Sequence, residues 1–135
     1  FLNKYLPRQS DVRTGGGAAE LNYKQNSYVI RLADTYLMQA EALVKANQNP
    51  TRAKELLDAV RGRVGLTSVP ATLDNIYNER RLELATEGHR FFDLVRTGKA
   101  AQSIPGFTSN KHELFPIPIE EIQFSAGNWQ QNPNY

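Results

Sequence analysis

The sequence predicts an all-α protein made of antiparallel helical hairpins and followed by a long irregular C-terminal tail. Two stretches, residues 29–44 and 53–64, place apolar side chains at the 3.6-residue period of an amphipathic helix. Only a short turn around Asn49 and Pro50 separates them, so the two helices are expected to be antiparallel neighbours. After Ser103, four prolines exclude long helices from the end of the chain.

The first hairpin carries the residues that usually begin and end helices. Its first helix is expected to run for about four turns from Val29. Asn49 followed by Pro50 is typical of an N-cap and a first helical position, and Gly65 is typical of a C-terminal cap. The residues expected to form the two apolar stripes are Val29, Leu32, Ala33, Tyr36, Leu37, Ala40, Leu43 and Val44, then Ala53, Leu56, Leu57, Val60 and Val64. Hairpins of this kind recur in tetratricopeptide-type repeats.

Two further helices are predicted before the tail. The first begins after Thr72 as N-cap and runs to about Glu87, where Gly88 ends it. The second is short and covers residues 90–96. We therefore expect an irregular lead-in of residues 1–28, a helical part of residues 29–98 and an irregular tail of residues 103–135, within a single domain or fragment of residues 1–135.

Composition excludes several classes of function. The 135 residues suffice for one compact domain, and 40% hydrophobic with 22% charged residues is ordinary for a soluble domain. The net charge is +2, but cations alternate with acids, as where Arg80 and Arg81 lie between Glu79 and Glu83. A nucleic-acid-binding protein usually gathers its cations into an unopposed stripe, so no nucleic-acid partner is expected.

No cofactor or metal site is expected from the sequence. There is no cysteine, and the spacing of Glu87 and His89 is one residue too short for a Glu-x-x-His di-iron motif. Neither a phosphate-binding loop nor a nucleophile elbow is present. No apolar run approaches the roughly 20 residues that span a bilayer. The chain begins at Phe1 without a signal-peptide pattern, which suggests a processed or partial sequence.

The third predicted helix places charged residues on its core-facing side. Arg80 and Glu87 share a face with Ile76 and Leu84, and Glu83 lies at its border. Buried charges are costly unless they are paired, so we expect a structural ion-pair network. Its expected members are Arg61, Arg63, Arg80, Glu83, Glu87, Arg90 and Asp93. The expected pairs are Arg80 with Glu83, Glu87 with Arg90, and Arg90 with Asp93.

The same carboxylates allow a different interpretation as catalytic acids. Glu83 and Glu87, one turn apart, could meet the carboxylate separation of about 5–10 Å that glycoside hydrolysis requires. A general acid needs a raised pKa, however, and neighbouring arginines lower it. We therefore favour a structural clamp and expect no catalytic residues.

Five segments, in order from about residue 28 to the end, resemble the SusD/RagB family of outer-membrane nutrient-binding lipoproteins. They are Arg31-Leu32-Ala33-Asp34 continuing through Leu37-Met38 and Ala40-Glu41-Ala42; Val60-Arg61 with Arg63 and Gly65-Leu66; Asn78-Glu79-Arg80-Arg81, Glu83-Leu84, Glu87-Gly88, Arg90, Asp93-Leu94, Arg96 and Gly98-Lys99; Phe115-Pro116-Ile117-Pro118 with Glu121-Ile122; and Gln131-Asn132-Pro133 with Tyr135. The third segment is the most specific. These segments match the C-terminal part of the family.

The resemblance implies a tetratricopeptide-like helical protein that binds glycans or other nutrients and is not an enzyme. It would lie on the outer-membrane surface, held by a lipid anchor in a missing N-terminal part, and would serve a SusC-like TonB-dependent transporter. Family members are several times longer and take most glycan contacts from upstream loops. The alternatives are a helical scaffold that binds another protein without touching sugar and, more remotely, a glycoside hydrolase.

The residues themselves offer one local candidate for sugar binding. Sugar rings stack on aromatic faces, and their hydroxyls hydrogen-bond to amides and carboxylates. Trp129, with Asn128 and Gln131, is the best such group in the sequence. Trp129 could instead fasten the tail to the helices, and of the two roles we favour this structural one.

Overall fold

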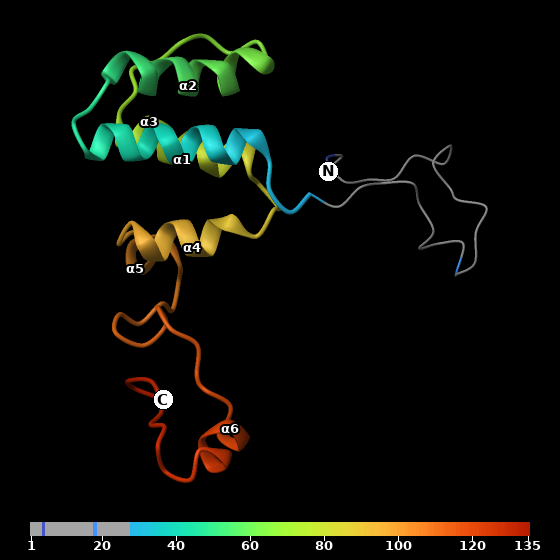
Figure 1. Cartoon of the computed structure of the whole chain (residues 1–135), viewed down its shortest axis with the longest axis vertical. Helices are drawn as coiled ribbons and strands as arrows, with labels where there is room; N and C mark the ends of the chain where they lie inside the picture. The colour runs from blue at the N-terminus through green and yellow to red at the C-terminus, as the bar shows by residue number, and fades with distance from the viewer. Residues whose placement is uncertain (1–3, 5–17, 19–27) are drawn as a thin grey trace.

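The computed structural model describes residues 4, 18 and 28–135. This part of the chain contains six helices and no strand, which confirms the all-α prediction (Figure 1). The helices are α1 (Leu32–Lys45), α2 (Pro50–Arg63), α3 (Leu73–Glu83), α4 (His89–Arg96), α5 (Ala100–Ser103) and α6 (Ile119–Phe124). The irregular lead-in expected for residues 1–28 lies almost wholly outside the described residues.

Helices α1 and α2 form the predicted antiparallel hairpin. The Asn49 side chain accepts a hydrogen bond of 3.1 Å from the backbone N–H of Arg52 and so caps α2, whose first residue is Pro50. Gly65 adopts a left-handed conformation after the last turn, as a C-terminal glycine should. Helix α1 begins at Leu32, three residues later than predicted, because Arg31 has an extended backbone and Val29 is 87% exposed.

The hydrophobic core lies where α1, α2 and α3 meet. Its buried members are Leu37, Ala40, Leu56, Leu57, Val60 and Ile76. Four of them, Leu37, Leu56, Leu57 and Ile76, are fully buried, and each contributes about 1.5–3 kcal/mol through its removal from water. Both apolar stripes of the hairpin therefore supply the core, and α3 closes it.

Helix α3 ends at Glu83 rather than near Glu87, and the hydrogen bonds explain why. In a continuing helix the Glu83 carbonyl would accept from the N–H of Glu87. That carbonyl instead accepts from the Arg31 guanidinium at 3.0 Å and from Lys4, while the Glu87 N–H bonds to Leu84. The chain then turns through Gly88, with a φ of 80°, into α4. This turn brings Glu83 and Glu87 to the same arginine.

The C-terminal part leaves the helical core and extends away from it (Figure 1). Of the two short helices that were not predicted, α5 still packs against α4, with Ala100 buried, whereas α6 lies in the extended part, which otherwise consists of turns and irregular backbone. Pro118 immediately precedes α6, consistent with a proline limiting the start of a short helix. Among the described residues, no helix is both long enough and apolar enough to cross a membrane.

Candidate functional site: an ion-pair network and an exposed aromatic tail

Arg80 is the central residue of a network of charged side chains between the helices. It is only 4% exposed. Its Nη1 donates to Asp34 on α1 at 2.7 Å, and its Nε donates to both carboxylate oxygens of Asp93 on α4 at 3.1 and 3.2 Å. Arg80 therefore joins three helices. The expected pairing with Glu83 does not occur, because the guanidinium points to the buried carboxylates of α1 and α4.

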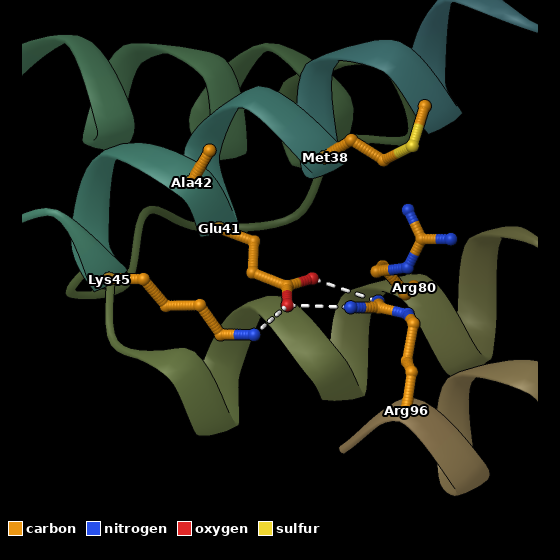
Figure 2. Close-up of a pocket in the computed structure, with 6 residues that line it drawn as sticks. All are labelled: Met38, Glu41, Ala42, Lys45, Arg80 and Arg96. Atoms are coloured by element: carbon orange, nitrogen blue, oxygen red, sulfur yellow. Dashed lines mark hydrogen bonds and ion pairs between the residues drawn. The ribbon is translucent and has the colours of Figure 1, made fainter.

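Glu41, on α1, is the second junction, and Figure 2 shows its surroundings. Both terminal nitrogens of Arg96 donate to its two carboxylate oxygens, at 2.6 and 2.8 Å, and Lys45 contacts it at 2.7 Å. Burial opposes ionisation of Glu41, but the hydrogen bonds from Arg96 and Lys45 outweigh it and lower its pKa to about 2. Glu41 is therefore ionised at neutral pH.

Glu83 and Glu87, the two candidate acids, both bind Arg31. Arg31 contacts Glu83 at 2.8 Å and Glu87 at 2.6 Å, and Arg63 contacts Glu83 from α2 at 2.8 Å. Lys4 also binds Glu87. Burial raises the pKa of Glu87, but the hydrogen bonds from Arg31 and Lys4 bring it down to about 2. Glu87 in this state has no proton to give at neutral pH, and arginine side chains hold both carboxylates, as a structural clamp requires.

A third buried carboxylate ties α2 to α3. Glu79 is 3% exposed and accepts a hydrogen bond of 2.6 Å from Arg61. Arg61 also donates to the Thr67 carbonyl at 2.9 Å and so holds the loop that follows α2. Arg61 was an expected network member, whereas its partner Glu79 was not.

The network omits Arg90 and includes residues that sequence reasoning missed. Arg90 is exposed and forms no ion pair with any residue that the structure describes, and Asp93 is taken by Arg80 and Arg96 instead. The missed members are Lys4, Arg31, Asp34, Glu41, Lys45, Glu79 and Arg96. A signal existed for two of them, since Asp34 and Glu41 are three and four residues from the buried Leu37, on the same face of α1.

The proposed sugar-binding residues lie together in the tail, but they are not equally available. Trp129 is 54% exposed, and no ring contact is recorded for it among the described residues. The Gln131 amide is held by the backbone, because its Nε2 donates to the Ile117 carbonyl and its Oε1 accepts from the Ile117 N–H, both at 2.8 Å. Asn128 donates to the Ser125 carbonyl at 2.8 Å, and its side-chain oxygen has no hydrogen-bond partner in the described part of the chain. The indole ring and the Asn128 side-chain oxygen are thus available to a ligand.

Aromatic rings connect α4 to the tail. Phe91 lies 5.6 Å from Phe92, 6.5 Å from Phe107 and 5.9 Å from Phe115, measured between ring centroids. His112 packs against Phe107, and its Nδ1 accepts from the Thr108 N–H at 2.9 Å, which assigns it a structural role. Within the described part of the chain, no group of three or more His, Asp or Glu residues could hold a metal ion.

Comparison with known proteins identifies the family. The profile of the SusD family matches residues 2–112, which include every member of the ion-pair network. The chain belongs to the SusD family.

Solved structures of SusD-like proteins share this fold. A laminarin-binding SusD-like protein is 58% identical, with a TM-score of 0.87, and the match covers 100% of this chain and 29% of the other. Surface glycan-binding protein A from Bacteroides thetaiotaomicron is 38% identical, with a TM-score of 0.77, over 89% of this chain and 27% of that protein. The same protein has been solved in complex with laminarihexaose.

Proteins related in sequence are SusD-like as well. SusD-like protein P25 from Formosa agariphila is 35% identical over 121 residues, which cover 76% of this chain and 23% of the relative. A SusD-like protein from Bacteroides ovatus is 33% identical over 97 residues, covering 70% of this chain and 18% of the relative. This SusD-family chain therefore spans about a fifth to a third of the length of the relatives that it matches. Trp129 and its neighbours lie beyond the part that the family profile matches.

Proposed function

We propose that this chain is part of a non-catalytic glycan-binding protein of a bacterial outer-membrane uptake system, and that its glycan is laminarin. The main support for this proposal is that the chain is 58% identical, over its full length, to a laminarin-binding SusD-like protein. The laminarihexaose complex of a 38% identical relative supports the same ligand class. A SusC-like transporter as partner and attachment to the outer membrane follow from the family and complete the proposal.

The charge state of the carboxylates supports capture without hydrolysis. Glu41 and Glu87 have pKa values lowered to about 2, whereas a glycosidase needs one carboxyl group that stays protonated near neutral pH. Glu83 is bound by two arginines. The ion-pair network is accordingly assigned a structural role, and sugar contact is assigned to Trp129 with the free oxygen of Asn128.

Calorimetric titration of the intact protein with laminarihexaose tests the proposal. Cellohexaose and maltohexaose, which contain the same sugar in other linkages, serve as matched ligand controls. We expect saturable binding of laminarihexaose, weaker binding of the controls, and no shorter oligosaccharides after prolonged incubation with laminarin. Release of shorter products, or no binding of any of the three, would refute it.

One observation favours a protein-binding scaffold as the second candidate function. Phe92, Phe115 and Phe124 are 62%, 68% and 85% exposed, and exposed aromatic side chains are enriched at protein interfaces. Under this alternative the intact protein would bind its transporter and ignore glycans. This alternative would be favoured if the intact protein co-purified with the transporter and calorimetric titration with glycans gave no binding signal.

A further inference from the structure

A hollow of about 250 Å³ lies between α1 and α2, away from the tail. Leu32 and Ala59 belong to its apolar wall, Tyr36 supplies an aromatic side chain, and Arg31 and Arg63 also line it. Small-molecule sites have this composition, with mostly apolar walls and a few polar groups that fix orientation. Because ligand pockets usually measure roughly 300–1,000 Å³, this hollow suits one sugar ring rather than a whole oligosaccharide.

Tyr36 is held in place and still has an unused polar group. Its side chain is partly buried and packs against the hydrophobic core, so the ring is positioned before any ligand arrives. Its hydroxyl has no hydrogen-bond partner among the described residues, although a partly buried tyrosine hydroxyl usually has one. The side chain therefore offers both an apolar surface and a free hydroxyl beside the hollow.

Arg63 provides spare donors next to this tyrosine. Only its Nη2 is engaged, with the two carboxylate oxygens of Glu83 at 2.9 and 2.8 Å. Its Nε and Nη1 have no acceptor in the described part of the chain. In Arg31, by contrast, all three guanidinium nitrogens donate hydrogen bonds to Glu83 or Glu87, so these bonds fix its position at the edge of the hollow.

The local charges favour an uncharged ligand. Every cation of this group is paired with a carboxylate: Arg31 with Glu83 and Glu87, Lys4 with Glu87, and Arg63 with Glu83. Among the described residues, the hollow therefore presents no unpaired cation that would draw in an anion. An aromatic side chain, aliphatic walls and unused N–H and O–H groups are the groups that recognise the apolar face and the hydroxyls of a neutral sugar.

We propose that the hollow between α1 and α2 is a second carbohydrate subsite, which binds one neutral hexose unit of a glycan against Tyr36 and Arg63. This inference rests on the proposed function, since it places part of the same glycan on the helices. It is independent of the tail, because none of the residues lining the hollow comes from beyond α2.

Cysteine protection in the intact protein tests the position of the sugar. Ala59→Cys places a thiol in the wall of the hollow, and Glu55→Cys places one on the same helix outside the lining. We expect saturating laminarihexaose to slow alkylation at position 59 by at least fivefold and to leave position 55 unchanged. An unchanged rate at position 59 would overturn the subsite while leaving the function standing, provided that titration still shows binding.

Two further results of the cysteine-protection experiment would also overturn the proposed subsite. A thiol at position 59 that fails to react without sugar would mean that the hollow is closed in the intact protein, which overturns the proposal. Absence of any binding to laminarihexaose would remove the function and the subsite together.

A pair of matched variants tests the donors. Arg63→Gln removes the guanidinium with its unused Nε and Nη1 donors, whereas Arg52→Gln removes the same charge from an exposed arginine of α2 that pairs with Glu55. Because a hydrogen bond from a charged group is strong, we expect Arg63→Gln to weaken laminarihexaose binding about tenfold. Equal dissociation constants for the two variants would exclude Arg63 from the subsite.

Discussion

Arg80 and Asp34 form an ion pair 2.7 Å long that joins α3 to α1 almost entirely out of contact with water, with side-chain exposures of 4% and 11%. Asp93 completes the arrangement from α4. A buried ion pair is weak evidence for net stability, because removing two charges from water costs several kcal/mol. Removing only one partner of such a pair is nevertheless strongly destabilising, because the other charge stays buried without a counter-ion.

Arg80→Ala should lower the free energy of unfolding by about 3–5 kcal/mol, because it leaves Asp34 as an unpaired buried charge. Arg81→Ala is the matched control, since Arg81 is exposed and its side chain hydrogen-bonds to only Asn78 among the described residues, and it should cost less than about 0.5 kcal/mol. Guanidinium denaturation of both variants measures the difference. Similar losses for the two would contradict a structural role for Arg80.

Acid should destabilise the chain within a defined window of pH. Glu41 and Glu87 have folded-state pKa values lowered from 4.5 to about 2, so their stabilisation is complete above pH 4.5 and disappears as the pH falls from 4.5 to 2. Each carboxyl group should contribute about 2–3 kcal/mol to this loss. Denaturation at a series of pH values measures it, and Glu41→Gln should flatten the curve in this window. A curve unaffected by Glu41→Gln would be evidence against the shift.

Trp129→Ala should weaken glycan binding with little loss of stability. The ring is 54% exposed, so its removal should cost about 1 kcal/mol or less in unfolding free energy, whereas loss of a stacking face should raise the dissociation constant for laminarihexaose about tenfold. Phe124→Ala, which removes an aromatic ring that is 85% exposed, is the control and should change neither quantity. A large stability loss with unchanged affinity would assign Trp129 to fastening the tail.

Gln131→Ala should loosen the tail without acting on sugar. Its amide makes two hydrogen bonds to the backbone of Ile117 and a third to the N–H of Asn132, so its loss should cost about 1–2 kcal/mol of local stability. Faster hydrogen exchange at the Ile117 amide would report this change. Gln130→Ala, at an exposed neighbouring position, should leave exchange unchanged. If Gln131→Ala instead lowers the affinity for laminarihexaose and leaves hydrogen exchange at the Ile117 amide unchanged, Gln131 belongs to a binding site.

Much of the helical fold was accessible from the sequence because its signals are local. Asn49 before Pro50, Thr72 before α3 and the apolar stripes of α1 and α2 each act within one or two turns. The structure contains both caps and most of each stripe, but the predicted stripe members Val29, Leu32 and Val64 are exposed. The end of α3 was predicted too late. The end of α3 depends on a hydrogen bond that the Glu83 carbonyl accepts from Arg31, a residue 52 positions earlier in the chain. A local sequence pattern cannot predict so distant a partner.

The candidate site was harder to predict for the same reason. The sequence indicated that charges would be buried and paired, but helix spacing proposed neighbours such as Glu83 for Arg80, whereas the actual partners come from α1 and α4. Arg90 was placed in the network by its closeness in sequence to Glu87 and Asp93, yet it points to solvent. In the tail, the hydrogen bonds between Gln131 and the backbone of Ile117 were not predicted, because Ile117 lies 14 residues earlier.

The spacing of the two ion-pair junctions on α1 has a consequence for how the helices align. Asp34 and Glu41 are seven residues apart, or about 10 Å along the axis, and they meet Arg80 and Arg96 from two different helices. Leucine and alanine side chains would still find apolar neighbours after a slide of one turn, whereas both carboxylates find their arginines in a single alignment. We therefore expect the charged residues to select one register from several that the apolar core alone would tolerate.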